Sequence, residues 1–339
     1  MNERLSATLS LVLPCSVPAA VLAAYWSGAG WAFRIGAWVY FGALALDFVG
    51  GIDEGPMGDR FSTRPFRLIT WLWVPQQAAL IITGLFAVRG ADLATIYVTS
   101  VGAGMIGGMF GIPVAHELMH RNTRFERVLA EIEMTLFGYA HFCIEHVEGH
   151  HANVGLRHDP ATARFGESLY AFIPRSVIGG FVNAWRLEVD RLRRSGLAVI
   201  GAGNRMLRYL LVVSAIVAGI ALWAGWRGVV FFAAQSVVAI MVIESINYVE
   251  HYGLVRDESE PVTARHSWNS SHRVSNWLLF NVPRHSDHHD DAARPYPLLR
   301  HAAEARQLPA GYFAMFVLAL FPPLWTAIMH PLLALDGEG

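Results

Sequence analysis

The stretch LATIYVTSVGAGMIGGMFGIPVAHELMH (93–120) combines the two features that decide the fold. Residues 93–115 are predominantly apolar and uncharged, and they are long enough to cross a bilayer, which takes about 20 residues. His116 and His120 follow at once, one helical turn apart, so that both imidazoles lie on one helix face. The stretch therefore predicts a membrane-spanning helix that carries a pair of metal-binding side chains at one end.

The composition agrees with a membrane protein. Of the 339 residues, 54 % are hydrophobic and 16 % are charged, whereas about 25 % are charged in an average soluble domain. These values exclude a disordered chain and argue against an ordinary soluble enzyme. The net charge of −1 gives no reason to expect a nucleic acid partner. Cys15 and Cys143 are too few for a disulfide framework, a four-thiolate zinc site or an iron–sulfur cluster.

Six apolar runs predict an all-α integral membrane protein that forms a single domain over residues 1–339. The predicted transmembrane helices cover residues 7–28, 32–50, 68–88, 93–115, 207–226 and 228–249. Arg34 and Asp47 fall near the ends of the second run, where long side chains reach the membrane interface. A further apolar segment, 312–335, contains Pro322–Pro323 and either spans the membrane or lies against the other helices as a broken helix.

Six spans leave the long segments 116–206 and 250–311 on one side of the membrane. All 26 basic residues are arginine, and 22 of them fall outside the spans on that side. The positive-inside rule therefore predicts that these segments form a cytoplasmic cap. Every dense group of histidines also lies on this side, so the cap is rich in histidine.

Nine of the 15 histidines fall in four short motifs within these segments. HELMH (116–120), EHVEGHH (145–151) and RHSDHH (284–289) each contain histidines four residues apart, and a single histidine follows the sixth span. Nine ligands imply two metal ions, and the cytoplasmic location without thiolate ligands favours iron. The predicted metal ligands are His116, His120, His146, His150, His151, His251, His285, His288 and His289.

Carboxylates stand beside these histidines. We expect Glu117, Glu145 and Glu148 to accept the second ring N–H of a ligand imidazole, or else to be solvated loop residues. Glu250 and Asp287 are candidate catalytic carboxylates. A third candidate is Glu244, which precedes His251 by two helical turns and lies at membrane depth, where an ionisable side chain is a functional candidate.

The segments HELMH, EHVEGHH, NYVEHYG (247–253) and RHSDHH, in this order, resemble those of the membrane-bound alkane 1-monooxygenases. This family lies within the integral-membrane fatty acid desaturase and hydroxylase superfamily, and NYVEHYG separates it from the wider group. HDPATARFGESLY, HSWNSSHRVSN and LPAGY agree as well, and the likeness runs from about Asp47 to about Pro331. It implies six membrane helices, two non-haem irons on the nine histidines and a bacterial inner-membrane location.

The resemblance also implies O₂-dependent terminal hydroxylation of alkanes, or of alkylbenzene methyl groups as in some relatives. Such hydrocarbon degradation is a branch of lipid metabolism. The implied electron source is a rubredoxin, or a ferredoxin, with an NADH-dependent reductase. Two alternatives stay open: an acyl-lipid desaturase or hydroxylase, and a membrane metal-binding protein without redox chemistry. His272 lies in a matching segment, and we expect it to support a ligand imidazole.

The remaining motifs concern electrons and substrate. Gly102–Gly107 matches G-x-G-x-x-G but lies inside a span, so we expect close helix packing there and not a nucleotide site. Without a C-x₂-C pair or a flavin motif, electrons must come from a separate protein. The cap carries a cluster of basic residues: Arg186, Arg191, Arg193 and Arg194. These charges could bind an acidic electron carrier, and the positive-inside rule accounts for them equally well. The hydrophobic substrate is expected to arrive from membrane lipid along the second span, near Val39 and Tyr40.

Overall fold

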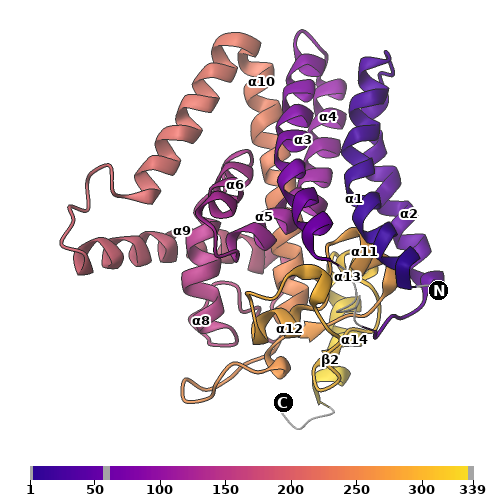
Figure 1. Ribbon diagram of the computed structural model, residues 1–339, viewed down its shortest axis with the longest axis vertical. Helices are drawn as coiled ribbons and strands as arrows, with labels where there is room; N and C mark the ends of the chain where they lie inside the picture. Colours follow the sequence, from indigo (N-terminus) through magenta and orange to yellow (C-terminus); the bar gives the residue numbers. More distant parts are fainter. Residues whose placement is uncertain (1–2, 56–61, 335–339) are drawn as a thin grey trace.

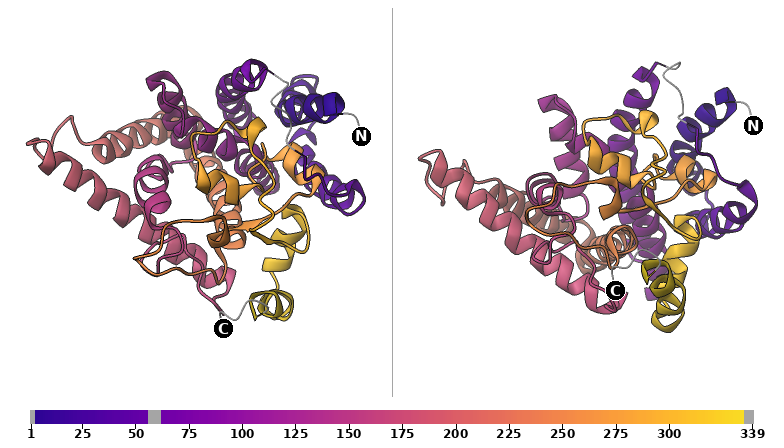
Figure 2. Two further views of the ribbon diagram at one scale, coloured as in Figure 1. Left: turned by 60° about the horizontal axis from the view of Figure 1, so that its bottom comes forward. Right: turned by 90° about the horizontal axis from the view of Figure 1, so that it is seen from below.

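The computed structural model describes residues 3–55 and 62–334. Within them the protein is mostly helical, with long helices at one end and a cap of mainly short helices and loops at the other (Figure 1). Seen from the cap end, the short C-terminal elements cover the ends of the long helices (Figure 2). The protein therefore divides into an apolar bundle and a cap.

Five helical segments of the described chain are long and apolar enough to cross a membrane. They lie in α1 (Glu3–Trp26), α2 (Ile35–Gly50) with η1 (Ala32–Arg34), α3 (Arg64–Val88), α4 (Leu93–Ile106) with its continuation, and α10 (Arg205–His251). The predicted fifth and sixth spans correspond to two helical limbs of α10, which is broken by a kink at Gly225. Gly225 has φ 65° and ψ −162°, which only glycine adopts readily, and Figure 1 shows the two limbs of α10 meeting there.

The small residues of the fourth span bring α4 close to its neighbours. A Cβ atom on Gly102 would lie 2.0 Å from the backbone oxygen of Phe33, and one on Gly104 would lie 2.6 Å from that of Gln235. The G-x-G-x-x-G match therefore lies at a helix contact, as the sequence predicted. After α4 the same helix continues through η2 (Gly107–Gly111), a π-helical turn, into α5 (Ile112–Met119), which leads into the cap.

The cap is built from two long segments of the chain. The first contains α6 (Arg124–Thr135), α7 (Phe142–Ile144), η3 (Glu145–His150), α8 (His151–Asn153) and α9 (Leu169–Arg194). The second contains η4 (Ala264–His266), α11 (Arg273–Leu278), α12 (His285–Asp290) and η5 (Tyr296–Leu298). Two short parallel strands, β1 (Trp268–Asn269) and β2 (Arg306–Gln307), close it, with Trp268 opposite Arg306.

The C-terminal apolar segment is a broken helix. It forms α13 (Tyr312–Ala319) and α14 (Pro322–Ala334), of 8 and 13 residues, separated just before the Pro322–Pro323 pair. Neither helix is long enough to span a bilayer alone. Of the two alternatives for this segment, the structure shows the broken helix up to Ala334. Position 335 lies outside the described residues.

Asp47 joins the bundle to the cap. It was expected to reach the membrane interface, but this is wrong, because its side chain is only 3 % exposed. Its carboxylate accepts hydrogen bonds from the backbone N–H of Ser275 (3.0 Å) and from the Ser275 hydroxyl. Ser275 in turn accepts one from the backbone N–H of Tyr312. A buried carboxylate is stable only when it is hydrogen-bonded in this way, so α2 is tied to both α11 and α13.

The α4–α10 contact gives a stability prediction. Gly104→Val places side-chain atoms against the Gln235 backbone and Val238, and overpacking of this kind costs about 1–3 kcal/mol. We expect a lower Tm in detergent, followed by intrinsic tryptophan fluorescence. Gly42→Val on α2 is the matched control, because no atom lies within 4 Å of its added Cβ. Equal melting of both variants would contradict the packing role.

Candidate metal centre

The nine predicted histidines lie together where the helices of the bundle enter the cap. Each comes from an element that ends or turns there: α5, η3, α8, the last residue of α10, and α12. They form two groups in which the ligand atoms lie within 4.8 Å of one another. The first group holds His116, His120, His146, His151 and His288, and the second holds His150, His251, His285 and His289.

The division between the groups follows local helix geometry. In α12, His285 and His289 are four residues apart and share the second group, as α-helical spacing requires, with their Nε2 atoms 2.9 Å apart. In η3, the rings of His146 and His150 lie side by side as expected, stacked with centroids 5.3 Å apart, but they belong to different groups. A π-helix aligns residues five apart, so His146 meets His151, with 3.1 Å between the Nε2 atoms.

The ring nitrogens that face the interior of each group lack ordinary hydrogen-bond partners. The Nε2 atoms of His116, His120 and His150 are buried without any partner. Elsewhere two Nε2 atoms face one another, as between His288 and His151 (3.1 Å). A buried ring nitrogen needs a proton donor, an acceptor or a metal ion. Converging Nε2 lone pairs therefore fit metal ligation, and imidazole suits iron, zinc, copper and nickel.

The rings of the cap are held neutral, which is the form that binds metal. Outside the membrane-spanning helices, burial lowers the pKa of six of the rings, and neighbouring imidazoles lower it further: His120, His146, His151, His285, His288 and His289. His150 differs. Burial lowers its pKa too, but the Asp159 carboxylate more than offsets this and raises it above the ordinary value.

Asp159 is the site residue that the sequence reasoning missed. Its Oδ2 lies 2.9 Å from His150 Nδ1, and both side chains are almost completely buried. Ala161 and Thr162 also donate to this carboxylate, at 3.0 Å each. A carboxylate on Nδ1 fixes the ring orientation and leaves Nε2 for a metal. The only signal in the sequence was the position of Asp159 inside HDPATARFGESLY.

Among the predicted carboxylates, Glu250 lies closest to a ligand ring. Its Oε2 is 3.3 Å from His285 Nε2, and its Oε1 accepts a hydrogen bond from the Tyr312 hydroxyl at 3.1 Å. Glu250 is thus placed as a further donor for the second group. Asp287 instead binds Arg294 and Arg300, which fix the loop after α12.

Three other carboxylates were expected to support the ligands. The buried Glu145 accepts a long hydrogen bond from Asn183 (3.4 Å), and burial together with Asp159 raises its pKa to about 8. Glu148 lies at the surface and pairs with Arg205 at 2.6 Å. Glu117 faces Arg121 at 3.5 Å.

Glu244 is buried in the second limb of α10, after Gly225, and pairs with a tyrosine. The hydroxyl of Tyr139 donates to its Oε1 at 2.9 Å. Burial, and next the Glu244 carboxylate, raise the pKa of Tyr139, so this hydroxyl keeps its proton.

The six remaining histidines have other surroundings, and none belongs to either group. His272 exchanges a hydrogen bond with the Ser270 hydroxyl at 3.0 Å, and within the described residues no hydrogen bond joins it to a ring of either group. His330 meets the Tyr252 hydroxyl at 2.9 Å, and His301 meets that of Ser271 at 2.8 Å. His158 bonds Asn153, His141 stacks edge-on against Tyr139, and His266 caps η4.

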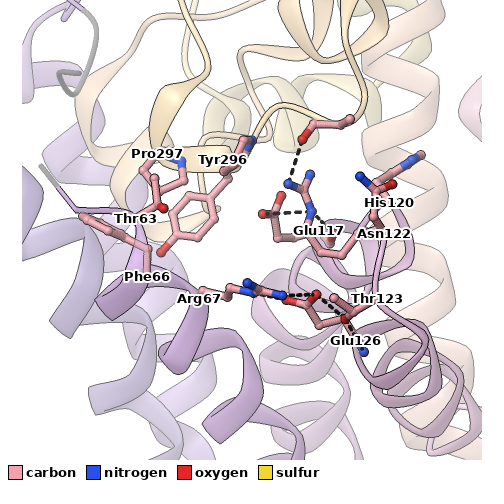
Figure 3. A pocket seen from close by; sticks show the side chains of 13 residues that line it. Thr63, Phe66, Arg67, Glu117, His120, Asn122, Thr123, Glu126, Tyr296 and Pro297 are labelled. Carbon is pink, nitrogen blue, oxygen red and sulfur yellow. Dashed lines mark hydrogen bonds and ion pairs between the residues drawn. The ribbon is translucent and has the colours of Figure 1, made fainter.

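A cavity of about 320 Å³ reaches the first histidine group from outside (Figure 3). His120 and Glu117 form part of its wall, opposite Phe66 and Tyr296. Arg67 and Glu126 form an ion pair on the floor, which Figure 3 marks with dashed lines. His120 is therefore the ligand ring that adjoins this cavity.

Val39 and Tyr40 lie on α2 beside the C-terminal helices. The Tyr40 hydroxyl donates to the backbone oxygen of Phe313 at 2.8 Å, and its ring packs edge-on against Phe313 and Phe316. Val39 is partly buried against the same core. That these residues line the substrate path stays a prediction.

Sequence comparisons agree with this geometry. The fatty acid desaturase family model matches residues 93–319. An alkane 1-monooxygenase of Ectopseudomonas oleovorans is 34 % identical over 314 residues, which are 86 % of this chain and 78 % of the relative. The chain belongs to the alkane 1-monooxygenase family.

Other alkane 1-monooxygenases are more similar over a shorter length. Alkane 1-monooxygenase 1 of Pseudomonas aeruginosa is 46 % identical over 233 residues, 67 % of this chain and 61 % of the relative. The chain thus spans less than two thirds of that relative. The hydroxylase component XylM of a xylene/toluene monooxygenase from Pseudomonas putida is 30 % identical over 305 residues, 87 % of this chain and 82 % of XylM. Membership of this family and the apolar helices together identify an integral membrane protein with a non-haem metal site.

The His150–Asp159 pair gives a prediction for metal binding. Loss of such a partner costs about tenfold to a hundredfold in metal affinity. We expect Asp159→Asn to release metal to a chelator correspondingly faster, measured as metal per chain after dialysis. Glu148→Gln is the control, because Glu148 faces Arg205 at the surface. Unchanged metal retention in Asp159→Asn, with unchanged thermal unfolding, would contradict this role.

Proposed function

We propose that this chain hydroxylates the terminal carbon of alkanes, or the methyl group of alkylbenzenes, with O₂ at a non-haem di-iron centre. The observation that carries the proposal is the pair of buried groups of converging imidazoles, with five and four rings. The names of the relatives, alkane 1-monooxygenase and xylene/toluene monooxygenase, support the substrate class. Hydroxylation consumes two electrons and two protons, and one oxygen atom enters the product while the other leaves as water.

Each group would hold one iron. The first supplies five imidazoles, and the second supplies four with the Glu250 carboxylate beside them. Iron with O₂ supplies the oxidising power for an unactivated C–H bond, which no side chain has. The chain's own residues orient the ligands and exclude water. Asp159 fixes the His150 ring, and Tyr312 fixes Glu250.

The proposed topology has six crossings, with the two limbs of α10 as the fifth and sixth. Gly225 then lies at the far surface, and each limb has about the 20 residues that a crossing requires. The concentration of arginine in the cap supports its placement in the cytoplasm, at the inner membrane of a bacterium.

Electrons would come from a rubredoxin, or a ferredoxin, reduced by an NADH-dependent reductase. An acidic carrier would meet basic side chains on the cap. Arg186 and Arg193 on α9 are exposed, whereas Arg191 is bound to Glu188 at 2.7 Å. We therefore place Arg186 and Arg193 ahead of Arg191 as docking residues.

Product analysis tests the function directly. Purified, iron-loaded protein in detergent is given a chemically reduced rubredoxin, O₂, and a panel of alkanes, alkylbenzenes and acyl lipids. We expect terminal alcohols that carry ¹⁸O from ¹⁸O₂, and their loss in His120→Ala and His251→Ala, one from each group. His158→Ala, which lies outside both groups, is the control. Desaturated or hydroxylated acyl chains would favour the lipid alternative, and bound metal without any product would favour a metal-binding protein.

Glu244 is proposed to support the centre or to carry protons to it. Its pairing with Tyr139 brings a carboxylate and a hydroxyl together in the buried part of α10, two helical turns before His251. We expect Glu244→Gln to lower turnover at least tenfold, since positioned proton transfer contributes about 10²–10⁴. Retained iron with low turnover would indicate proton transfer, and lost iron would indicate support of the ligands. Full activity with full iron content would refute both roles.

A further inference from the structure

Two adjoining cavities lie between α6 and the first turns of α10, on the outer side of the metal cap. The first has a volume of about 410 Å³ and is lined mainly by charged residues. The second has about 340 Å³ and is mainly apolar. They share four lining residues, so they form one groove with a polar and an apolar half: Val128, Glu131, Arg208 and Tyr209.

The polar half carries an excess of positive charge. Four arginines line it, and one of them, Arg205, is neutralised by Glu148 at 2.6 Å. The other three have no ion-pair partner in the part of the chain that the structure describes: Arg124, Arg127 and Arg208. Glu131 is the remaining acid, and it accepts a hydrogen bond from Tyr209 at 2.8 Å. Three free guanidinium groups against one carboxylate form a site for an anion.

The apolar half continues from the polar half along both helices. On α10, Arg208 is followed at intervals of four residues by Val212 and Ile216, so that the same face changes from basic to aliphatic. On α6 and just beyond it, Val128 is followed in the same way by Ile132 and Leu136. Val212 is 47 % exposed and Ile132 44 %, so the groove offers apolar surface that no part of the described protein covers.

The position of the groove matches the membrane interface. Arg205 is the first residue of a membrane-spanning helix, and the groove runs from there toward the bundle. In Figure 1 the first limb of α10 leaves the bundle at an angle on the side of α6. Basic side chains at this depth meet lipid headgroups, while the aliphatic side chains one and two turns further meet acyl chains.

We propose that the groove binds an anionic phospholipid, with its phosphate on Arg124, Arg127 and Arg208 and one acyl chain between Ile132 and Val212. The basic half of the groove matches the charged headgroup of a phospholipid, and the adjoining apolar half matches its acyl chain. A hydrocarbon has no charge to satisfy the arginines, and a free phosphate leaves the aliphatic half uncovered. The site is separate from the proposed catalytic function and does not depend on it.

The first test removes the charges. Delipidated wild-type protein and R124Q/R127Q/R208Q are titrated in detergent with phosphatidylglycerol and with phosphatidylcholine, and bound lipid is counted by native mass spectrometry. Each basic residue near a membrane surface contributes about a factor of five, so we expect about 100-fold weaker phosphatidylglycerol binding in the variant. The control R64Q/R157Q/R265Q removes three exposed arginines outside the groove, and we expect it to bind like the wild type. Wild-type binding by the groove variant would overturn the proposal.

The second test fills the apolar half and leaves the arginines intact. I132W/V212W is expected to lose phosphatidylglycerol binding at least tenfold while keeping any binding of glycerophosphate, because only the chain is excluded. Thermal unfolding checks that each variant is folded. If the arginine variant does not fold, lipid binding by I132W/V212W tests the proposal instead. Equal binding of phosphatidylcholine, or displacement of the lipid by inorganic phosphate at similar concentration, would overturn the proposal in favour of unspecific lipid contact or a free-anion site.

Discussion

Nine imidazole rings share a volume from which water is largely excluded, and this is the constraint on which the rest of the structure depends. Burial opposes protonation, because a charged imidazolium loses its hydration and gains charged neighbours. Rings such as that of His146 then remain neutral, and several Nε2 atoms face one another. Hydrophobic packing gives no reason for such an arrangement, whereas a bound metal ion satisfies many lone pairs at once. The free energy of metal binding therefore contributes to the stability of the cap.

That constraint explains why so many elements end at one place. α5 and α10 deliver His116 and His251 from the bundle, while η3, α8 and α12 bring the others from the cap. The hydrogen bonds that hold these elements come from outside the two groups, as between Asp47 and Ser275 or between Asp287 and Arg300. The carboxylates around the two groups thus divide into two kinds. Asp159 and Glu250 contact the rings, and Asp287 and Glu148 bind arginines.

The sequence predicted the helical fold, the apolar runs and the gathering of the nine histidines, because hydrophobic length and residue type carry those signals directly. It did not predict their distribution between two groups, since α-helical spacing was assumed for 145–151 and the chain forms a π-helix there. Asp159 was not predicted as a partner of His150, because the chain between them includes a loop, where side-chain periodicity does not apply. The boundary between the fifth and sixth apolar runs was predicted at Arg227, where the charge interrupts the hydrophobic pattern, and the helix breaks two residues earlier, at Gly225.

The position of the centre between bundle and cap has a consequence for selectivity. A hydrocarbon gains about 0.8 kcal/mol per buried CH₂, but it gains this in the bilayer as well as in the protein. Net affinity then changes little with chain length, and discrimination must come from the shape of the path to the metal. Tyr40, which we propose lines this path, has little conformational freedom, because its hydroxyl donates to the Phe313 backbone and its ring packs against Phe313 and Phe316. A side chain with so little freedom sets a boundary, whereas a flexible one would yield to longer substrates.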